Sequence, residues 1–317
     1  MPKQFLVILL FVPFICLAQA DSVKIIEKVS DHVSSTEEMK VFYSQKLINA
    51  NTVEVLRKGI MEFRVSHAFG DIGGSNGGVK NFFGLDNSFD VRIGFQAGLT
   101  NRLNVLLSRS KGASPVQQLY EIGLKYQFLR QEENDSKHPL SLTLFANSVV
   151  SSMNANDQED QENSFKKFGD RTSEVVQLMI AKKIGKISLQ LNPTFVTREY
   201  VINGDDKSLF SLGAGARIPL TSRFVFIADY FHTFRSQASK DLFADPGRGS
   251  LHFYDALGLG FEILTAGHIF HLNFTNATEL LENRFIPRTV SNWGEGQFRW
   301  SFTISRNFII FRDKKNK

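Results

Sequence analysis

The sequence of 317 residues contains a single cysteine, Cys16, and only 8 prolines. One cysteine excludes a disulfide framework and any zinc or iron–sulfur site that needs several thiolates. Beyond residues 1–20, no apolar run approaches the roughly 18 residues that a membrane-spanning helix needs. The formal net charge of +5 is small and is spread along the chain, so no nucleic-acid partner is predicted. Phenylalanine, in contrast, is abundant, with 30 residues.

The first 20 residues have the pattern of a secretory signal peptide. Lys3 provides the positive charge, residues 5–16 form a short apolar run, and Ala18-Gln19-Ala20 is a small-x-small cleavage site. We therefore predict an exported protein. Its predicted parts are a signal peptide (1–20), an N-terminal extension (21–60) that is either a periplasmic tail or a plug, a barrel (61–311) and a basic tail (312–317).

From residue 61 onward, apolar and polar residues alternate, which is typical of β-strands with two different faces. Residues 89–99 show it best, with apolar side chains at every odd position. The same pattern recurs about twelve times, mostly in runs of about ten residues, the length of a tilted strand that crosses a bilayer. The predicted strands are 61–69, 89–99, 103–109, 118–129, 140–150, 173–183, 187–197, 208–218, 223–232, 251–263, 268–276 and 298–304.

Short and long connections alternate between these strands, as in outer-membrane barrels with periplasmic turns and external loops. A secreted β-sandwich also has alternating strands, but its strands are usually shorter. We therefore predict an all-β fold, an antiparallel up-and-down transmembrane β-barrel of about twelve strands in the outer membrane. Its phenylalanine-rich faces would contact lipid, and its polar faces would line a wet lumen.

The polar faces place charged residues in the lumen. Glu62, Arg64, Asp90 and Arg92 fall on neighbouring strands with the same parity and could form a cross-strand charge network. Such a network is either a constriction that selects solutes or a structural filling of a narrow barrel. Further lumen-facing candidates are Glu121, Lys125, Arg217, Asp229, Glu262 and Arg299.

These features favour a narrow channel or transporter for a small polar solute. The alternative is a closed barrel with a structural or partner-binding role, in which the external loops 151–172 and 277–296 contact a partner. Outer-membrane lipid is the expected surrounding in both cases, and no cofactor is predicted.

A surface hydrolase is the weaker third possibility. Ser66 and His67 are adjacent, so on a strand they point to opposite faces and cannot pair. His271 with Ser301 or Thr275 is conceivable, but no Gly-x-Ser-x-Gly elbow is present. We therefore expect no enzyme activity and no catalytic residue.

Metal and phosphate sites are not predicted either. The acidic loop at residues 157–162 lacks the spacing and the turn glycine of a calcium loop, and two lysines follow it. The glycine-rich stretch 70–78 precedes no helix and is expected to be flexible or inward-folding, and Asp205-Asp206 is expected to be a turn. The acidic residues considered are Asp157, Glu159, Asp160 and Glu162.

Several stretches resemble an uncharacterised Bacteroidetes-type outer-membrane β-barrel family, a domain of unknown function. The matching stretches are 62–70, 81–86, 91–94, 241–246, 267–270 and 273–276. The resemblance covers most of residues 45–311 and departs at Ala68, where arginine is usual, and at Ala266, where glycine is usual. It implies the barrel and the location but no activity.

Overall fold

The computed structural model describes residues 39–132 and 138–311 of the chain. The predicted signal peptide, the predicted basic tail and the predicted extension up to residue 38 lie outside the described residues. Twelve strands form the fold. They are β1 (Ile60–Asp71), β2 (Ser88–Gly98), β3 (Leu103–Ser110), β4 (Leu119–Leu129), β5 (Ser141–Ser151), β6 (Thr172–Ile184), β7 (Ile187–Arg198), β8 (Ser208–Pro219), β9 (Phe224–Phe234), β10 (Ala256–Leu264), β11 (Ile269–Thr275) and β12 (Arg299–Ile309).

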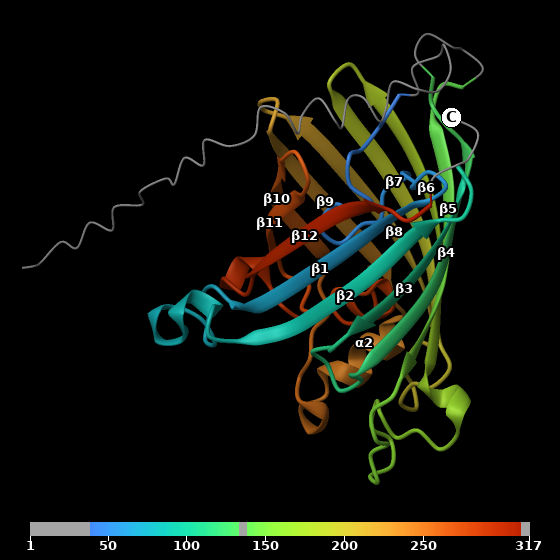
Figure 1. Ribbon diagram of the computed structural model, residues 1–317. Coiled ribbons are helices and arrows are strands. Elements are labelled where there is room, and N and C mark those ends of the chain that lie inside the picture. Colours follow the sequence, from blue (N-terminus) through green and yellow to red (C-terminus); the bar gives the residue numbers. More distant parts are fainter. Residues whose placement is uncertain (1–38, 133–137, 312–317) are drawn as a thin grey trace, which may run out of the picture. The chain divides into compact units, whose positions relative to one another are not determined.

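The strands close into a barrel. Each strand is antiparallel to its sequence neighbours, and β12 pairs with β1, where Val65 lies opposite Ile304. In Figure 1 the turns between β6 and β7 and between β8 and β9 at the upper end are short, whereas longer connections such as that between β5 and β6 lie at the lower end. This closed antiparallel barrel confirms the predicted fold class. Closure satisfies the backbone hydrogen bonds of every strand, which a sheet in lipid requires.

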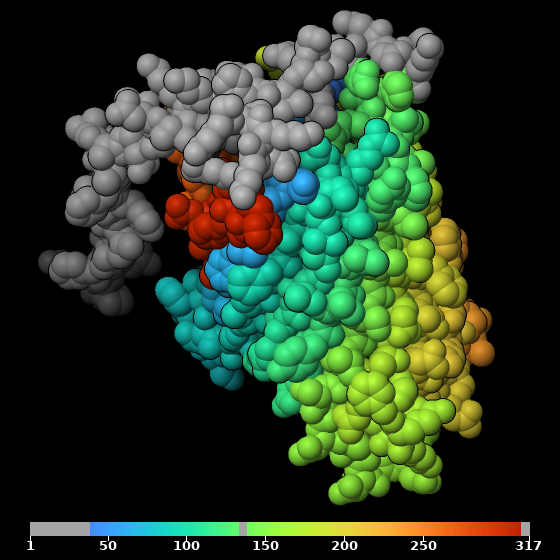
Figure 2. Space-filling model, turned by 45° about the vertical axis from the view of Figure 1, so that its right-hand side comes forward, coloured from blue at the N-terminus to red at the C-terminus, as the bar shows by residue number. Residues whose placement is uncertain are grey.

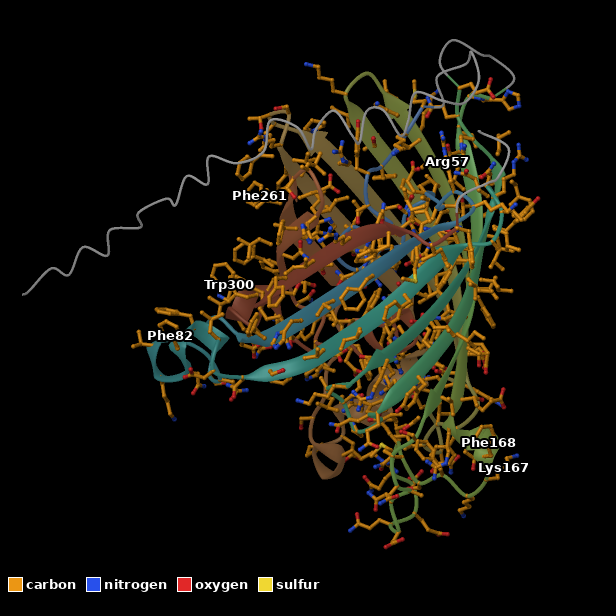
Figure 3. The ribbon with its side chains drawn as sticks, in the orientation of Figure 1. Arg57, Phe82, Lys167, Phe168, Phe261 and Trp300 are labelled. Carbon is orange, nitrogen blue, oxygen red and sulfur yellow. The ribbon has the colours of Figure 1, made fainter. Side chains whose placement is uncertain are left out.

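The two faces of the strands differ as predicted. On β4 the buried positions are Leu119, Glu121, Gly123, Lys125 and Gln127, and the exposed positions between them are Tyr120, Ile122, Leu124, Tyr126 and Phe128. The exposed apolar side chains are 39–56% accessible, whereas Glu121 and Lys125 are each 3% accessible. Figure 2 shows the outer wall that these strands form, and Figure 3 shows Phe261 and Trp300 pointing away from the barrel. At β4 the wall is therefore polar inside and apolar outside, the arrangement that lipid favours. Other strands also turn apolar side chains inward, such as Phe145, Met179 and Phe231, which form a buried core cluster with residues of the inner segment, residues 39–58.

Two strand boundaries differ from the prediction. β10 begins at Ala256 rather than at residue 251, because Leu251 donates its N–H to the carbonyl of Phe243 in the preceding loop. β12 extends to Ile309, because β1 offers pairing partners as far as Ile60. The first difference depends on a contact within the preceding loop, and the second on a partner distant in sequence.

Short helices lie in the long connections. They are η1 (Val79–Gly84), η2 (Phe168–Arg171), α2 (Gln237–Ala244), η3 (Pro246–Arg248), α3 (Glu282–Phe285) and η4 (Trp293–Glu295). Within the described part of the chain, none of the helices is both long and apolar enough to span a bilayer.

Candidate functional site

The lumen holds a piece of the chain itself, residues 39–58, which we call the inner segment. It precedes β1 and is the blue coil inside the barrel in Figure 1. The segment turns back on itself where Leu47 donates its N–H to the carbonyl of Ala50 at 2.8 Å. Its most deeply buried apolar side chains, all 2% accessible or less, are Val41, Phe42, Leu47, Ala50 and Val53.

Asp229 of β9 anchors this turn. Its Oδ2 accepts the backbone N–H groups of Ile48, Asn49 and Ala50 at 3.0, 2.6 and 2.8 Å. Its Oδ1 accepts the side-chain amide of Asn49 at 2.9 Å. A carboxylate that is 2% accessible is costly to bury unless donors surround it. The inner segment supplies those donors from its own backbone.

Other wall residues bind the main chain of the inner segment in the same way. Asn104 of β3 accepts the N–H of Leu56 at 2.7 Å and donates to its carbonyl at 2.8 Å. Gln190 of β7 accepts the N–H of Val53 at 2.9 Å, and Thr143 of β5 donates to the Val53 carbonyl at 2.7 Å. Hydrogen bonds from strands around the barrel thus hold a single length of polypeptide.

A second stretch, residues 276–291 between β11 and β12, also lies inside the barrel, and we call it the inward loop. Leu281 and Phe285 are at most 1% accessible, and the Phe285 ring meets Phe231 of β9 edge-on at 5.2 Å. Glu282 of this loop pairs with Lys46 of the inner segment at 2.7 Å, which joins the two stretches.

The prediction that loop 277–296 reaches a partner outside is wrong for most of its length. Glu279 and residues 281–287 are buried, and only part of the loop, around Gly294 and Glu295, is exposed. The physical reason is the apolar content of α3 and its flanks, which an external loop would leave in water. The glycine-rich stretch 70–78 also differs from its prediction as a flexible or inward-folding loop. It leads into the short helix η1, whose Phe82 lies on the loop that projects from the barrel in Figure 3.

The four charged residues of the predicted cluster all face the lumen, but they fall into separate groups. Glu62 and Arg64 pair along β1 at 2.8 Å. Arg92 pairs with Glu121 on β4. Asp90 accepts the hydroxyl of Ser110 at 2.6 Å and the backbone N–H groups of Gly112 and Leu280 at 2.8 and 3.0 Å. Parity is enough to predict that these residues point inward, but it does not predict their partners.

The other predicted lumen residues are also buried and paired. Arg217 of β8 contacts Glu262 of β10 at 2.9 Å, and His271 of β11 lies 3.5 Å from the same carboxylate. Lys125 donates to Gln45 of the inner segment at 3.1 Å. Arg299 donates to Asp71 and to Ser291 of the inward loop, each at 2.6 Å.

Several lumen groups were not singled out in the sequence. Asn104 and Gln190 follow the inward parity of their strands, so alternation alone would have identified them. No sequence signal marks Lys46 or Glu282, because each becomes a lumen residue only when a loop folds into the barrel.

The candidate hydrolase residues lie apart. Ser66 faces inward and accepts a hydrogen bond from Thr303 at 2.9 Å, whereas His67 faces outward and stacks on Phe302 with ring centroids 5.5 Å apart. The Nδ1 of His271 lies 3.1 Å from the carbonyl of Leu47. In the described residues no hydrogen bond joins His271 to Ser301 or Thr275.

The acidic loop residues also have partners. Glu159 pairs with Lys166 at 3.1 Å, Asp160 pairs with Arg248 at 2.6 Å, and Glu162 pairs with Arg288. Among residues 39–132 and 138–311 no group of three histidine, cysteine or acidic side chains is placed to hold a metal ion.

Asp205, expected to be part of a turn, lies at the centre of an ion-pair cluster at the long-loop end of the barrel. Its carboxylate contacts Arg198 at 3.0 Å and Arg235 at 2.5 Å, and it accepts the hydroxyl of Ser239 at 2.6 Å. Burial acts to raise the pKa of Asp205, but Arg198 and Arg235 outweigh it and hold the pKa below its ordinary value.

This lowered pKa makes a pH-dependent prediction. Asp205→Asn is expected to destabilise the protein by about 2 kcal/mol at pH 7, because hydrogen bonds to a charged acceptor are lost. The contribution of a group with a lowered pKa is complete above its unfolded pKa of about 4 and disappears as the pH falls through the folded pKa. Urea unfolding of both proteins at pH 7 and pH 3 measures this. An equal difference at both pH values would contradict the assignment.

Comparison with known proteins gives a family but no close relative. No curated protein matches the chain. The NanC porin structure is 7% identical over 79% of this chain and 100% of that chain, with a TM-score of 0.45. The KdgM porin is 7% identical over 78% and 99%, with a TM-score of 0.45. LpxR from Salmonella typhimurium is 10% identical over 79% and 99%, with a TM-score of 0.34. At this level of similarity, none of them indicates what this chain binds.

The family comparison is decisive. Residues 42–308 match the family model described as a membrane-bound β-barrel domain. This range includes eleven complete strands, nearly all of β12 and most of the inner segment. The chain therefore belongs to the membrane-bound β-barrel domain family DUF5777 and is an outer-membrane β-barrel, as the strand pattern and the resemblance predicted.

Proposed function

We propose that this protein is a narrow outer-membrane channel for a small polar solute, and that the inner segment closes it. The supporting observation is the way the wall binds this segment. Asp229, Asn104 and Gln190 hydrogen-bond to its main chain. A purely structural lumen is expected to interlock wall to wall, as in small filled barrels.

Displacement of the inner segment would leave a largely polar lumen beside the inward loop, with an apolar side at Phe145, Met179 and Phe231. The side chains that now form hydrogen bonds with the backbone of the inner segment would then face water and solute. Glu62, Arg64, Asp90 and Arg92 would supply the charges that filter the solute, as the sequence suggested, although in separate groups. The channel is thus closed at rest and opens when residues 39–58 move.

A disulfide between the segment and the wall tests this proposal. A Cβ atom at Gly215 of β8 would lie 2.6 Å from Cδ1 of Leu47, so the two positions are in direct contact and are the pair to test for a disulfide. We expect Leu47→Cys with Gly215→Cys, in a Cys16→Ala background, to conduct no ions in planar bilayers until a reductant is added. Leu47→Cys alone is the matched control and should conduct as the reduced protein does.

The results separate the alternatives. Equal conductance in the locked and reduced proteins would show that the inner segment does not close the path. No conductance in any form, at any voltage, would favour the closed barrel instead.

One observation supports that second candidate, a closed barrel that binds a partner. The loop containing η1 exposes apolar side chains, with Val79 81% and Phe82 60% accessible. Phe82 and Phe83 also have left-handed backbone angles, with φ of 46° and 53°, which residues other than glycine rarely adopt. An exposed apolar loop in a strained conformation is typical of a contact surface.

A further inference from the structure

A cleft at the long-loop end of the barrel has the features of a binding site. Its volume is about 450 Å³ including its open mouth. It is built from the connections that follow β3, β5 and β7, the neighbouring strand ends and the inward loop. The side chains that matter for its chemistry are Phe165, Arg171, Arg198, Tyr200, Asp205 and Arg284.

Two buried guanidinium groups at this cleft have spare hydrogen-bonding capacity. Arg198 is 9% accessible and Arg284 is 5% accessible. The Nε atoms of both have no hydrogen-bond partner among the described residues, although the Nε of Arg284 lies 3.5 Å from a carboxylate oxygen of Glu279. An unpaired buried donor costs about 1–3 kcal/mol, and more when it is charged. Such donors beside an open cleft favour a ligand that reaches them and accepts from them.

One terminal nitrogen of each arginine already has a partner. A terminal nitrogen of Arg198 contacts the carboxylate of Asp205 at 3.0 Å. A terminal nitrogen of Arg284 donates to the hydroxyl of Ser114. These contacts hold the two arginine side chains in place, so that binding a ligand requires little further ordering of them.

The acidic groups of the cleft are already paired as well. Asp205 is shared by Arg198 and Arg235, as described above. Asp170 accepts the backbone N–H groups of Lys166 and Lys167 at 2.9 and 3.0 Å. Glu162 pairs with Arg288. The carboxylates that line the cleft thus have partners, whereas Glu279, outside the lining, lies 3.5 Å from Arg284 without a hydrogen bond. A ligand carboxylate would complement the free donors of the cleft.

One wall of the cleft is aromatic. The rings of Phe165 and Tyr200 meet edge-on with their centroids 6.3 Å apart. Arg171 lies over the Phe165 ring at 4.9 Å. Val116 and Leu119 complete the apolar side. A flat or ring-shaped ligand body would be buried against this wall.

We propose that this cleft binds a small organic anion, whose carboxylate accepts hydrogen bonds from Arg198 and Arg284 while its ring packs against Phe165 and Tyr200. Long loops face outward in barrels of this type, so the site lies at the outer mouth. The inference deepens the proposed function by naming the class of solute, and it rests on that function only for what happens to the anion after it binds.

The test is calorimetric titration of the full-length protein in detergent with benzoate and with benzamide, which has the same shape but no charge. We expect benzoate to bind at least about tenfold more tightly than benzamide. Arg198→Gln and Arg284→Gln are each expected to weaken benzoate binding by about tenfold or more. Arg248→Gln is the matched control, because it removes the same charge from an exposed pair with Asp160 and should bind benzoate as the unmodified protein does.

The difference in gel migration between heated and unheated samples shows whether each variant is folded. If Arg198→Gln does not fold, Arg284→Gln still tests the site, because it leaves the Asp205 cluster intact. Equal binding of benzoate and benzamide, or undiminished benzoate binding by a folded Arg284→Gln protein, would overturn the proposal. Benzoate binding in a protein that never conducts would remove the channel and leave this site standing. Conductance without benzoate binding would remove this site and leave the channel standing.

Discussion

Replacing Asp229 by alanine is expected to open the barrel. The three backbone N–H groups of Ile48, Asn49 and Ala50 would lose a shared charged acceptor at 2.6–3.0 Å. Hydrogen bonds to charged groups contribute about 1.5–3 kcal/mol each, so the closed state should lose about 3 kcal/mol or more. That loss corresponds to an increase of about 100-fold in the open population. Bilayer recordings should show it as frequent opening events.

A second measurement follows the inner segment directly. Ala50 is 0% accessible, so Ala50→Cys should resist a maleimide reagent in the otherwise unmodified barrel. With Asp229→Ala added, the same cysteine should react. Asp255→Ala is the control, because Asp255 contacts His232 and Thr233 at the strand end and, among the described residues, forms no hydrogen bond to the inner segment. Unchanged conductance together with unchanged labelling would mean that Asp229 does not hold the segment.

Replacing Glu262 by alanine is expected to have the largest effect on stability. The carboxylate contacts Arg217 at 2.9 Å and lies 3.5 Å from His271, and all three side chains are at most 4% accessible. Removing one partner of a buried ion pair costs about 3–5 kcal/mol, because the other charge is left uncompensated. The loss would also reach the inner segment, because Arg217 lies over the Tyr43 ring at 4.5 Å.

Urea unfolding in lipid vesicles measures this effect. The matched variant is Arg217→Met with Glu262→Leu, which removes both charges and should recover most of the lost stability. Glu174→Ala, on the outward face of β6, serves as the control for loss of a strand glutamate and should change stability far less. A Glu262→Ala protein as stable as the control would show that the pair does not contribute.

The strands of the barrel wall could be predicted from the sequence, whereas the pairing of the side chains inside the barrel could not. Alternation identified every strand and the direction of all ten predicted lumen residues, because a period of two is a local property of the chain. It did not predict that Arg92 pairs with Glu121 rather than with Asp90. That choice depends on the register of β2, β3 and β4, which is set by pairing between separate strands.

The candidate anion site shows the same limit. Arg284 is far from Arg198 and Asp205 in the sequence, and none of the three is part of a recognisable motif. Asp205 suggested only a turn, and Arg284 lay in a loop expected outside the barrel. They meet because the inward loop enters the lumen next to the ends of β6 and β7.

The sequence by itself determined the barrel, its polar interior, its phenylalanine-rich exterior and its outer-membrane setting, because these follow from strand length and alternation. Only the tertiary structure decided what occupies the interior. Residues 39–58 and 276–291 have no repeating pattern, and their polar backbone groups can be satisfied either by water or by the wall. The wall satisfies these backbone groups where carboxylate and amide side chains from several strands converge on one stretch of main chain, as at Asp229. That convergence exists only once the barrel has closed.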